Sequence, residues 1–179
     1  MEFIGQRISI LKKENEKSIV IISFIDKAKN KLLLLWLLLW SLSGLIIFIN
    51  YFLITDPNTK TAIIVWMGFW AYFEYKIFYV YLWRKSGKEK IKIRDKKLLY
   101  KLDISGKGKI KEYELDLIKN LRLVAADENS FAEILNSSYW MIADEKLTFD
   151  YKGKEIKLAY QLNNNDAKAL LNLLIKELK

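Results

Sequence analysis

The 179-residue chain contains no cysteine and no histidine. Without cysteine it can form no disulfide, no iron–sulfur cluster and no thiolate zinc site. Without histidine it lacks the commonest general base, the commonest metal ligand and the usual proton switch near neutral pH. Asp, Glu, Lys, Ser or Tyr could support catalysis, but the sequence contains no catalytic motif that we recognise. We therefore expect no enzymatic activity, no cofactor and no metal site.

Proline and glycine are also scarce, with one proline and seven glycines. Together with the lack of low-complexity tracts, this composition argues against disorder and long linkers. The apolar residues are unevenly spread, since most Leu, Ile, Phe and Trp residues fall within 32–83. The remainder, about 125 residues, is enough for one small hydrophobic core.

Two long apolar runs predict a membrane hairpin. Residues 32–54 read LLLLWLLLWSLSGLIIFINYFLI without a charge, which is long enough for a helix to cross a hydrocarbon core of ~30 Å. A turn-forming segment, 55–60, separates this run from a second one at 61–83. In lipid both runs must be helices, because two lone strands would leave unpaired edges. A cleaved signal peptide is a poor alternative, since its apolar core is shorter and lies nearer the N-terminus.

The charges around the two runs predict their orientation. The segment between them carries one cation, Lys60, beside Asp56. Cations accumulate on both outer sides of the runs, which by the positive-inside rule places both chain termini in the cytoplasm. We therefore expect a two-pass protein of the cytoplasmic (inner) membrane. The flanking cations are Arg7, Lys12, Lys13, Lys17, Lys27, Lys29 and Lys31 before the first run, and Arg84, Lys85, Lys88 and Lys90 after the second.

Glu74 and Lys76 interrupt the second apolar run. If the helix continues to the end of the run, Glu74 lies near mid-depth, where a carboxylate marks a functional or partner-facing position. Alternatively the lipid-facing helix ends near Tyr75, and Lys76 extends to the membrane interface. The sequence leaves both interpretations open. Trp66 and Trp70, on the aromatic face of the same run, are further candidates for contact with a membrane partner.

Outside the apolar runs, short alternating segments predict antiparallel strands. The turn Ser105–Gly108 separates two of them, and the segment 127–144 is a less regular insert with an expected helical turn at 131–135. The segment 7–11 and the segment 18–24 predict a hairpin around a turn at 12–17. The other expected strands are 88–94, 97–102, 109–113, 118–124, 146–151 and 154–160.

The C-terminal segment predicts an amphipathic helix. Five apolar residues fall on one face of it, and Asn163 to Asp166 offers N-capping side chains. These residues are Ala167, Leu170, Leu171, Leu174 and Leu178. The expected fold class is a two-span membrane α-helical hairpin plus an α+β domain, in which this helix caps a bent antiparallel sheet or small barrel. The expected parts are an N-terminal strand hairpin at 1–31, belonging to the same sheet, the transmembrane hairpin at 32–83 and the cytoplasmic domain at 84–179.

Several short motifs carry a resemblance to a known family. They are the two tryptophan-rich runs, Trp83-Arg-Lys-Ser-Gly-Lys-Glu89, Glu112-Tyr-Glu-Leu115 leading to Ile118-Lys-Asn-Leu-Arg122, and Phe149-Asp-Tyr-Lys-Gly-Lys154. In these features the chain resembles bacterial two-span membrane proteins with a pleckstrin-homology-like domain, similar in layout to the photosystem I assembly protein family. The resemblance implies a pleckstrin-homology-like barrel with a capping helix and a scaffolding or assembly role. It implies no catalytic residues. The insert at 127–144 departs from the glycine-rich stretch that the family leads us to expect.

The net charge of +9 is concentrated beside the second apolar run. Residues 84–111 contain twelve Lys or Arg and three acidic residues, whereas residues 112–179 contain nine basic and twelve acidic residues. Anionic lipid headgroups attract such cations. Nucleic-acid binding is not expected, because nearby aromatics such as Tyr100 and Tyr113 fall at inward-facing positions. The candidate lipid contacts are Arg84, Lys85, Lys88 and Lys90.

These observations predict a membrane-anchored interaction or assembly module that acts as a scaffold or accessory subunit. Its expected partners are the anionic lipid bilayer and either another membrane protein or a second copy of the chain. An alternative is an oligomerising membrane effector, in which a small β-rich sensor domain gates a two-helix pore or a membrane-disrupting element. Glu74 and the aromatic second run motivate that alternative.

Overall fold

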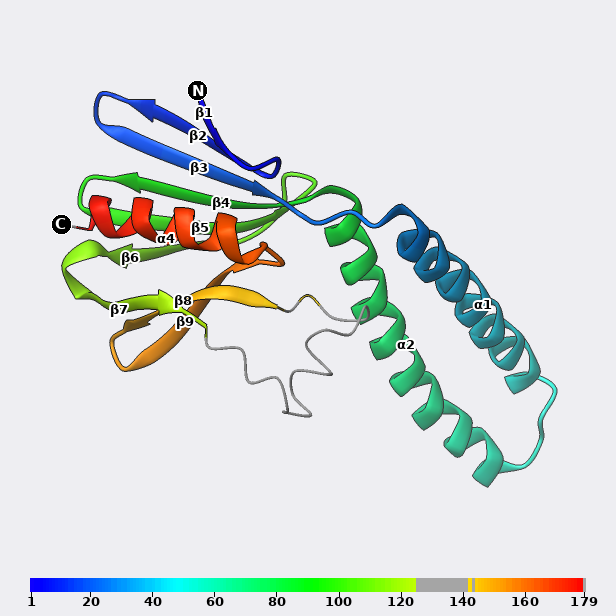
Figure 1. Ribbon diagram of the computed structural model, residues 1–179. Coiled ribbons are helices and arrows are strands. Elements are labelled where there is room, and N and C mark those ends of the chain that lie inside the picture. The colour runs from blue at the N-terminus through cyan, green and yellow to red at the C-terminus, as the bar shows by residue number, and fades with distance from the viewer. Residues whose placement is uncertain (125–141, 143, 179) are drawn as a thin grey trace. The chain divides into compact units, whose positions relative to one another are not determined.

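The computed structural model describes residues 1–124, 142 and 144–178. The chain forms two compact units, one made of Met1–Phe24 with Trp83–Lys179 and the other of Ile25–Leu82. We call the first the sheet domain and the second the helical hairpin (Figure 1). Most of the insert at 127–144, with its expected helical turn, lies outside the described residues.

Two long helices, α1 (Lys27–Tyr51) and α2 (Pro57–Ser86), make up the helical hairpin, and the last turn of α2 belongs to the sheet domain. Asp26 caps α1 by accepting hydrogen bonds from the backbone N–H groups of Ala28 and Lys29, both at 3.1 Å. Asp56 accepts one from the N–H of Thr59 at 2.7 Å, just before α2 begins at Pro57. Both helices begin before the apolar runs that predicted them.

By length and composition, α1 is the one helix in the described parts of the chain that is able to cross a membrane. Most of its apolar side chains are exposed, as those of a membrane helix would be and those of a soluble core helix would not. α2 does not meet the same measure. It carries Glu74 and Lys76, and its many tyrosines and tryptophans are less apolar than the leucines of α1.

The larger sheet of the sheet domain is a six-stranded antiparallel meander, β1 to β6 in chain order. The helical hairpin is inserted between β3 and β4, which pair directly from Glu16↔Arg94 to Ile22↔Lys88. The turn between β2 and β3 is tighter than predicted, because β2 extends to Lys13. The strands are β1 (Glu2–Ile4), β2 (Ile8–Lys13), β3 (Glu16–Ile22), β4 (Gly87–Arg94), β5 (Lys97–Ile104) and β6 (Ile110–Glu114).

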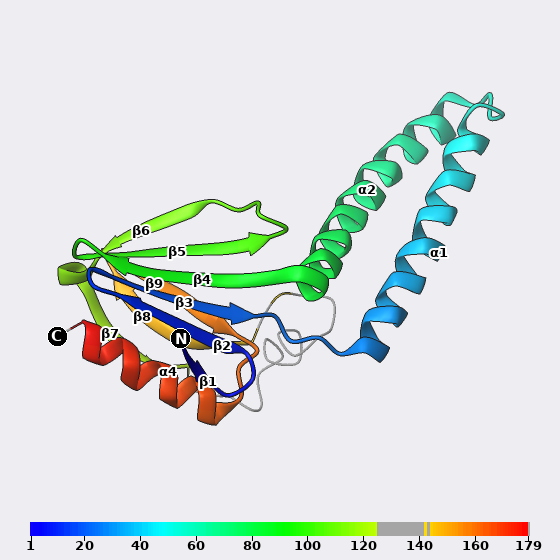
Figure 2. The same ribbon diagram turned by 90° about the horizontal axis from the view of Figure 1, so that it is seen from above.

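A 3-10 helix, η1 (Leu115–Leu117), leads to a second antiparallel sheet of β7 (Ile118–Leu123), β8 (Glu145–Tyr151) and β9 (Lys154–Tyr160). The C-terminal helix α4 (Asn164–Glu177) packs against β7 and β8 and against β1, the first strand of the other sheet (Figure 2). The side chain of Asn163 caps it, as predicted. The expected α+β class with antiparallel strands and a C-terminal helix is therefore confirmed.

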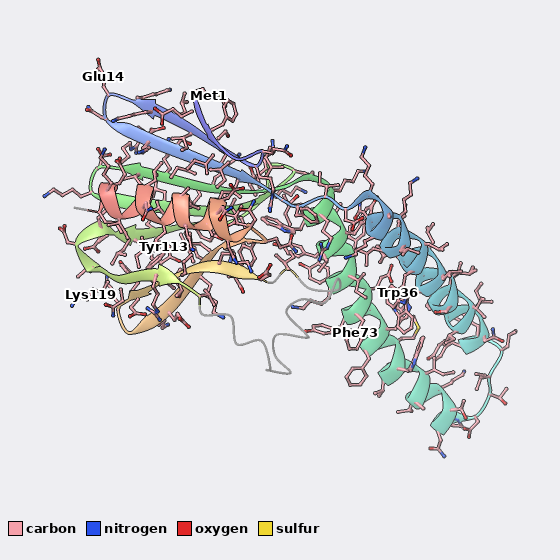
Figure 3. All side chains as sticks on the ribbon, in the orientation of Figure 1. Met1, Glu14, Trp36, Phe73, Tyr113 and Lys119 are labelled. Atoms are coloured by element: carbon pink, nitrogen blue, oxygen red, sulfur yellow. The ribbon has the colours of Figure 1, made fainter. Side chains whose placement is uncertain are left out.

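The core of the sheet domain follows the predicted alternation. Each of β2, β3 and β4 turns two isoleucines inward at alternate positions, and α4 adds the apolar face that its spacing predicted. Figure 3 shows Tyr113 among these inner side chains, where its ring meets that of Phe149 edge-on at 5.3 Å. The fully buried members are Ile8, Ile10, Ile19, Ile21, Ile91, Leu147, Phe149, Leu158, Ala159, Leu162, Ala167, Leu170 and Leu174.

Candidate functional site

Two polar contacts join the helices of the hairpin. Ser41 of α1 donates its hydroxyl to the Oε1 atom of Glu74 on α2 at 2.6 Å. One helical turn earlier on α2, the indole N–H of Trp70 donates to the backbone oxygen of Trp40 at 3.0 Å. Gly44 lies where a Cβ atom would come within 2.1 Å of the Trp70 ring, so the close approach requires glycine. We call these five residues the polar seam.

The tryptophans around the polar seam form a continuous aromatic cluster. Trp36 stacks on Trp40 with 5.1 Å between ring centroids, and Trp40 lies 6.4 Å from Trp66. Figure 3 shows Trp36 between the helices and Phe73 on the opposite side of α2. Trp66 and Trp70, which the sequence put forward as partner contacts, therefore contact α1 of the same chain.

Glu74 is only partly satisfied by the polar seam. Its second oxygen, Oε2, is buried and has no hydrogen-bond partner within the part of the chain that the structure describes. Lys76 does not supply one, because residues two apart on a helix point to different sides. Its ammonium group instead lies 5.6 Å from the ring centroid of Tyr72. The structure thus brings Glu74 to the contact between the helices and leaves Lys76 outside it.

The four cations proposed as lipid contacts do not behave alike. Lys85 and Lys88 are exposed. Lys90 is half-exposed and forms an ion pair with the buried carboxylate of Asp103, which also pairs with Lys101 at 3.3 Å. Arg84 is only 4% exposed, so its guanidinium is not available to a headgroup. Within the predicted set, exposure therefore favours Lys85 and Lys88 as lipid contacts.

A second buried carboxylate, Glu89, lies on the inner face of β4 and is 1% exposed. It accepts hydrogen bonds from the backbone N–H groups of Ala159 at 2.9 Å and Tyr160 at 2.6 Å, and from the hydroxyl of Tyr100 at 3.0 Å. Ala159 adopts a left-handed backbone conformation with φ of 65° and drops out of the ladder between β8 and β9. This irregularity leaves neighbouring N–H groups free to bind a side chain.

Arg7 completes the surroundings of Glu89. Its guanidinium donates to the backbone oxygens of Ile22 at 2.8 Å and Tyr160 at 3.3 Å, and also to that of Gln161. Arg7 thereby joins the end of β3 to the end of β9. The ring of Trp83, in the last turn of α2, meets that of Tyr160 edge-on at 6.0 Å. The network around Glu89 therefore holds together the strand ends next to both links to the helical hairpin.

Burial dominates the proton affinities in this network. Removal from water raises the pKa of Glu89 to about 7, although its three hydrogen bonds and the charge of Arg7 oppose the change. Burial, together with the nearby carboxylate, also raises the pKa of Tyr100, and burial lowers the pKa of Arg7. The network can therefore take up a proton near neutral pH.

The sequence interpretation missed Glu89, although one signal pointed to it. Glu89 alternates with Ile91 and Ile93, so the period of two that predicted the strand also placed Glu89 on the inner face. Within the described ranges, no group of three or more acidic side chains could hold a metal ion. Searches against protein-family models, curated proteins and solved structures found no match to the chain.

Proposed function

We propose that the chain is a membrane-anchored, non-enzymatic interaction or assembly module at the cytoplasmic face of the inner membrane. The observation that carries the proposal is the insertion of the helical hairpin into one sheet, between the paired strands β3 and β4. The sheet domain is consequently attached through two short links instead of one flexible tail. Such an attachment suits a scaffold or accessory subunit, which must hold a partner at a fixed place beside the membrane.

The same insertion supports a two-span topology. β3 and β4 are neighbouring strands, so both links must lie on one side of any membrane that α1 crosses. The chain then has to return, and α2, with 30 residues or about 45 Å, is long enough. The polar seam supports this topology too, because it gives Glu74 a partner within the hairpin. Fusions of a cytoplasmic and a periplasmic reporter to the C-terminus test the topology, and activity of the periplasmic reporter alone would contradict it.

A pleckstrin-homology-like fold of the sheet domain is part of the proposal. Two antiparallel sheets follow one another in the chain. α4 packs against β1, the first strand of one sheet, and against β7, the first strand of the other. This arrangement fits a bent sheet closed by a C-terminal helix. We assign the domain a binding role.

The expected partner is a membrane protein. On α2, away from the polar seam, Val65, Gly68, Phe69, Tyr72 and Phe73 line a shallow apolar groove. A Cβ atom at Gly68 would meet nothing within 4 Å, so a larger side chain fits without disturbing the hairpin. The groove is therefore a suitable place to probe partner binding without unfolding the chain.

Affinity capture from native membranes in mild detergent tests the proposal. We expect a membrane protein in a fixed stoichiometric ratio, and a variant with Gly68→Leu should recover less of it if the groove takes part. Leu42→Phe is the matched control, because it adds bulk at an exposed position of α1. A monomeric chain without any stoichiometric partner in several detergents would contradict the assembly role.

The second candidate function is an oligomerising membrane effector. The observation that favours it is the buried Oε2 atom of Glu74, which lacks a hydrogen-bond partner in the described structure. Opening of the hairpin would release the carboxylate from Ser41 and expose it to a pore or to another copy. Overexpression should then depolarise cells, and Glu74→Ala should abolish the depolarisation, whereas Lys60→Ala should not. A normal membrane potential at high expression would eliminate this candidate.

A further inference from the structure

The two links between the sheet domain and the helical hairpin are held side by side. The backbone N–H of Ser23 donates to the oxygen of Gly87 at 3.1 Å, and the Ser23 hydroxyl donates to the oxygen of Arg84 at 3.3 Å. These bonds continue the pairing of β3 and β4 beyond the end of the strands. The residues on either side of Ser23 therefore have fixed positions.

Those two residues, Ile22 and Phe24, are apolar yet exposed, with 42% and 49% of their surface accessible. Arg7 contacts both residues. Its Nε donates to the backbone oxygen of Ile22 at 2.8 Å, and its Cζ lies 5.8 Å from the centre of the Phe24 ring. Both side chains are thus held in position without being covered by the sheet domain.

Their distance along the chain from the membrane helix is short. Phe24 precedes Lys27, the first residue of α1, by three residues, which span at most ~11 Å when extended. Lys88 follows Ser86, the last residue of α2, by two residues, and Lys85 lies within the last turn of that helix. If α1 and α2 cross the bilayer with the apolar runs 32–54 and 61–83 in its hydrocarbon core, Phe24 lies eight residues and Lys85 two residues from that core. All four side chains are then near enough to reach the headgroup layers, which are roughly 5–7 Å thick on each side.

We propose that Ile22, Phe24, Lys85 and Lys88 form a membrane-surface contact that fixes the depth of the sheet domain at the bilayer. This inference rests on the proposed function, since it requires α1 to be in the membrane. Its occupant is the anionic surface of that same bilayer. Aromatic and aliphatic side chains enter the interface, while lysines bind headgroup phosphates. Ile22 and Lys88 are direct cross-strand neighbours, so apolar and cationic groups alternate within the contact.

The natural absence of cysteine allows a direct test with single-cysteine variants of the full chain. Ile22→Cys and Phe24→Cys would carry a fluorescent label in vesicles of phosphatidylcholine and phosphatidylglycerol. Leu11→Cys is the matched control, because Leu11 has the same 42% exposure. Leu11 pairs with Ser18, four residues before Ile22 on β3, and so lies ~13 Å farther along the strands. Leu38→Cys, in the apolar part of α1, reports membrane insertion itself.

We expect lipid-borne nitroxide to quench the labels at positions 22 and 24 several-fold more than the label at 11, and aqueous iodide to show the reverse order. Equal access of iodide to positions 11, 22 and 24, with position 38 still quenched by lipid, would overturn the contact and leave the membrane anchor intact. Quenching at position 11 as strong as at 22 would also overturn it, because the whole sheet face would then lie on the membrane. Loss of lipid quenching at position 38 would instead refute the proposed function.

Discussion

The sheet domain and the helical hairpin each withdraw a carboxylate from solvent, but they provide it with different numbers of hydrogen-bond donors. Glu89 in the sheet domain has three hydrogen-bond donors, two of which are backbone N–H groups. For Glu74 in the helical hairpin, the structure gives one donor, the Ser41 hydroxyl. The reason is that an α-helix uses its own backbone donors internally, whereas an irregular strand can release them. A helical hairpin can therefore satisfy a buried acid only with side chains.

The largest effect is expected from removing the better-satisfied carboxylate. Glu89→Ala leaves the N–H groups of Ala159 and Tyr160 and the charge of Arg7 without their buried partner, which should cost about 3–5 kcal/mol of unfolding free energy. Thermal and denaturant unfolding of the sheet domain in detergent measures the loss. Glu112→Ala, which removes an exposed ion pair with Lys97, should change it by about 0.5 kcal/mol or less. A similar loss for both variants would refute the role of the Glu89 network.

The second prediction concerns pH. Because the pKa of Glu89 is raised from 4.5 to about 7 in the folded protein, the folded state binds the proton more tightly than the unfolded state. The contribution of Glu89 to stability is therefore complete below pH 4.5 and falls by about 3 kcal/mol as the pH rises through 7.

Glu89→Gln cannot titrate, so the difference in unfolding free energy between the natural chain and this variant isolates the effect. We expect the natural chain to lose stability relative to the variant between pH 4.5 and pH 7, with little further change at higher pH. A difference that does not vary with pH, or that varies in the opposite direction, would show that folding does not raise the pKa of Glu89.

The third prediction addresses packing in the helical hairpin. Gly44→Ala places a methyl group where the Trp70 ring lies, and the ring must move away from its bond to Trp40. We expect the substitution to lower the free energy of separating the two helices by about 1–3 kcal/mol, which is typical of an overpacked contact. In single-molecule unfolding, the helices of the variant should therefore separate at a lower force. Gly68→Ala is the control, because its added atom meets no neighbour. Equal unfolding forces for the two variants would place Trp70 away from Gly44.

The smallest effect is expected from the single side-chain donor of Glu74. A double-mutant cycle of Ser41→Ala and Glu74→Gln should give a coupling of roughly 0.6 kcal/mol, and at most about 2, if the two helices lie in a membrane as proposed. A cycle of Ser43→Ala with Glu74→Gln should give none, because the Ser43 hydroxyl bonds to Trp40 within its own helix. If the coupling energy between Ser41 and Glu74 were as large as the stability lost in Glu89→Ala, the two carboxylates would not differ in how strongly their donors stabilise them.

Much of the secondary structure could be predicted from local patterns. Alternation identified β4 and β9, and helical spacing identified the face of α4 that packs on the sheets. β1 was missed, because its three residues are too few to show a period and are ordered by pairing with β2, as in Phe3↔Ser9. The second span stays a prediction, since Glu74 makes α2 less apolar than α1.

The candidate site was less predictable. Periodicity could assign Glu89 to the inner face, but its donors Ala159 and Tyr160 are some seventy residues away, and no sequence signal marked the left-handed bend at Ala159. Similarly, charge patterning grouped Arg84 with its exposed neighbours, whereas folding buried it. Charge is a property of the residue alone, but burial depends on what other segments cover.

The sequence by itself determined where the helices and most strands form, since these depend on residues a few positions apart. It also set the excess of cations on both sides of the apolar segments. Only the tertiary structure decided which cations remain exposed, which partners Glu74 and Glu89 obtain, and that β3 pairs with β4 across the inserted helices. These features depend on contacts between segments distant in the chain, and their free energies arise only when folding removes both partners from water.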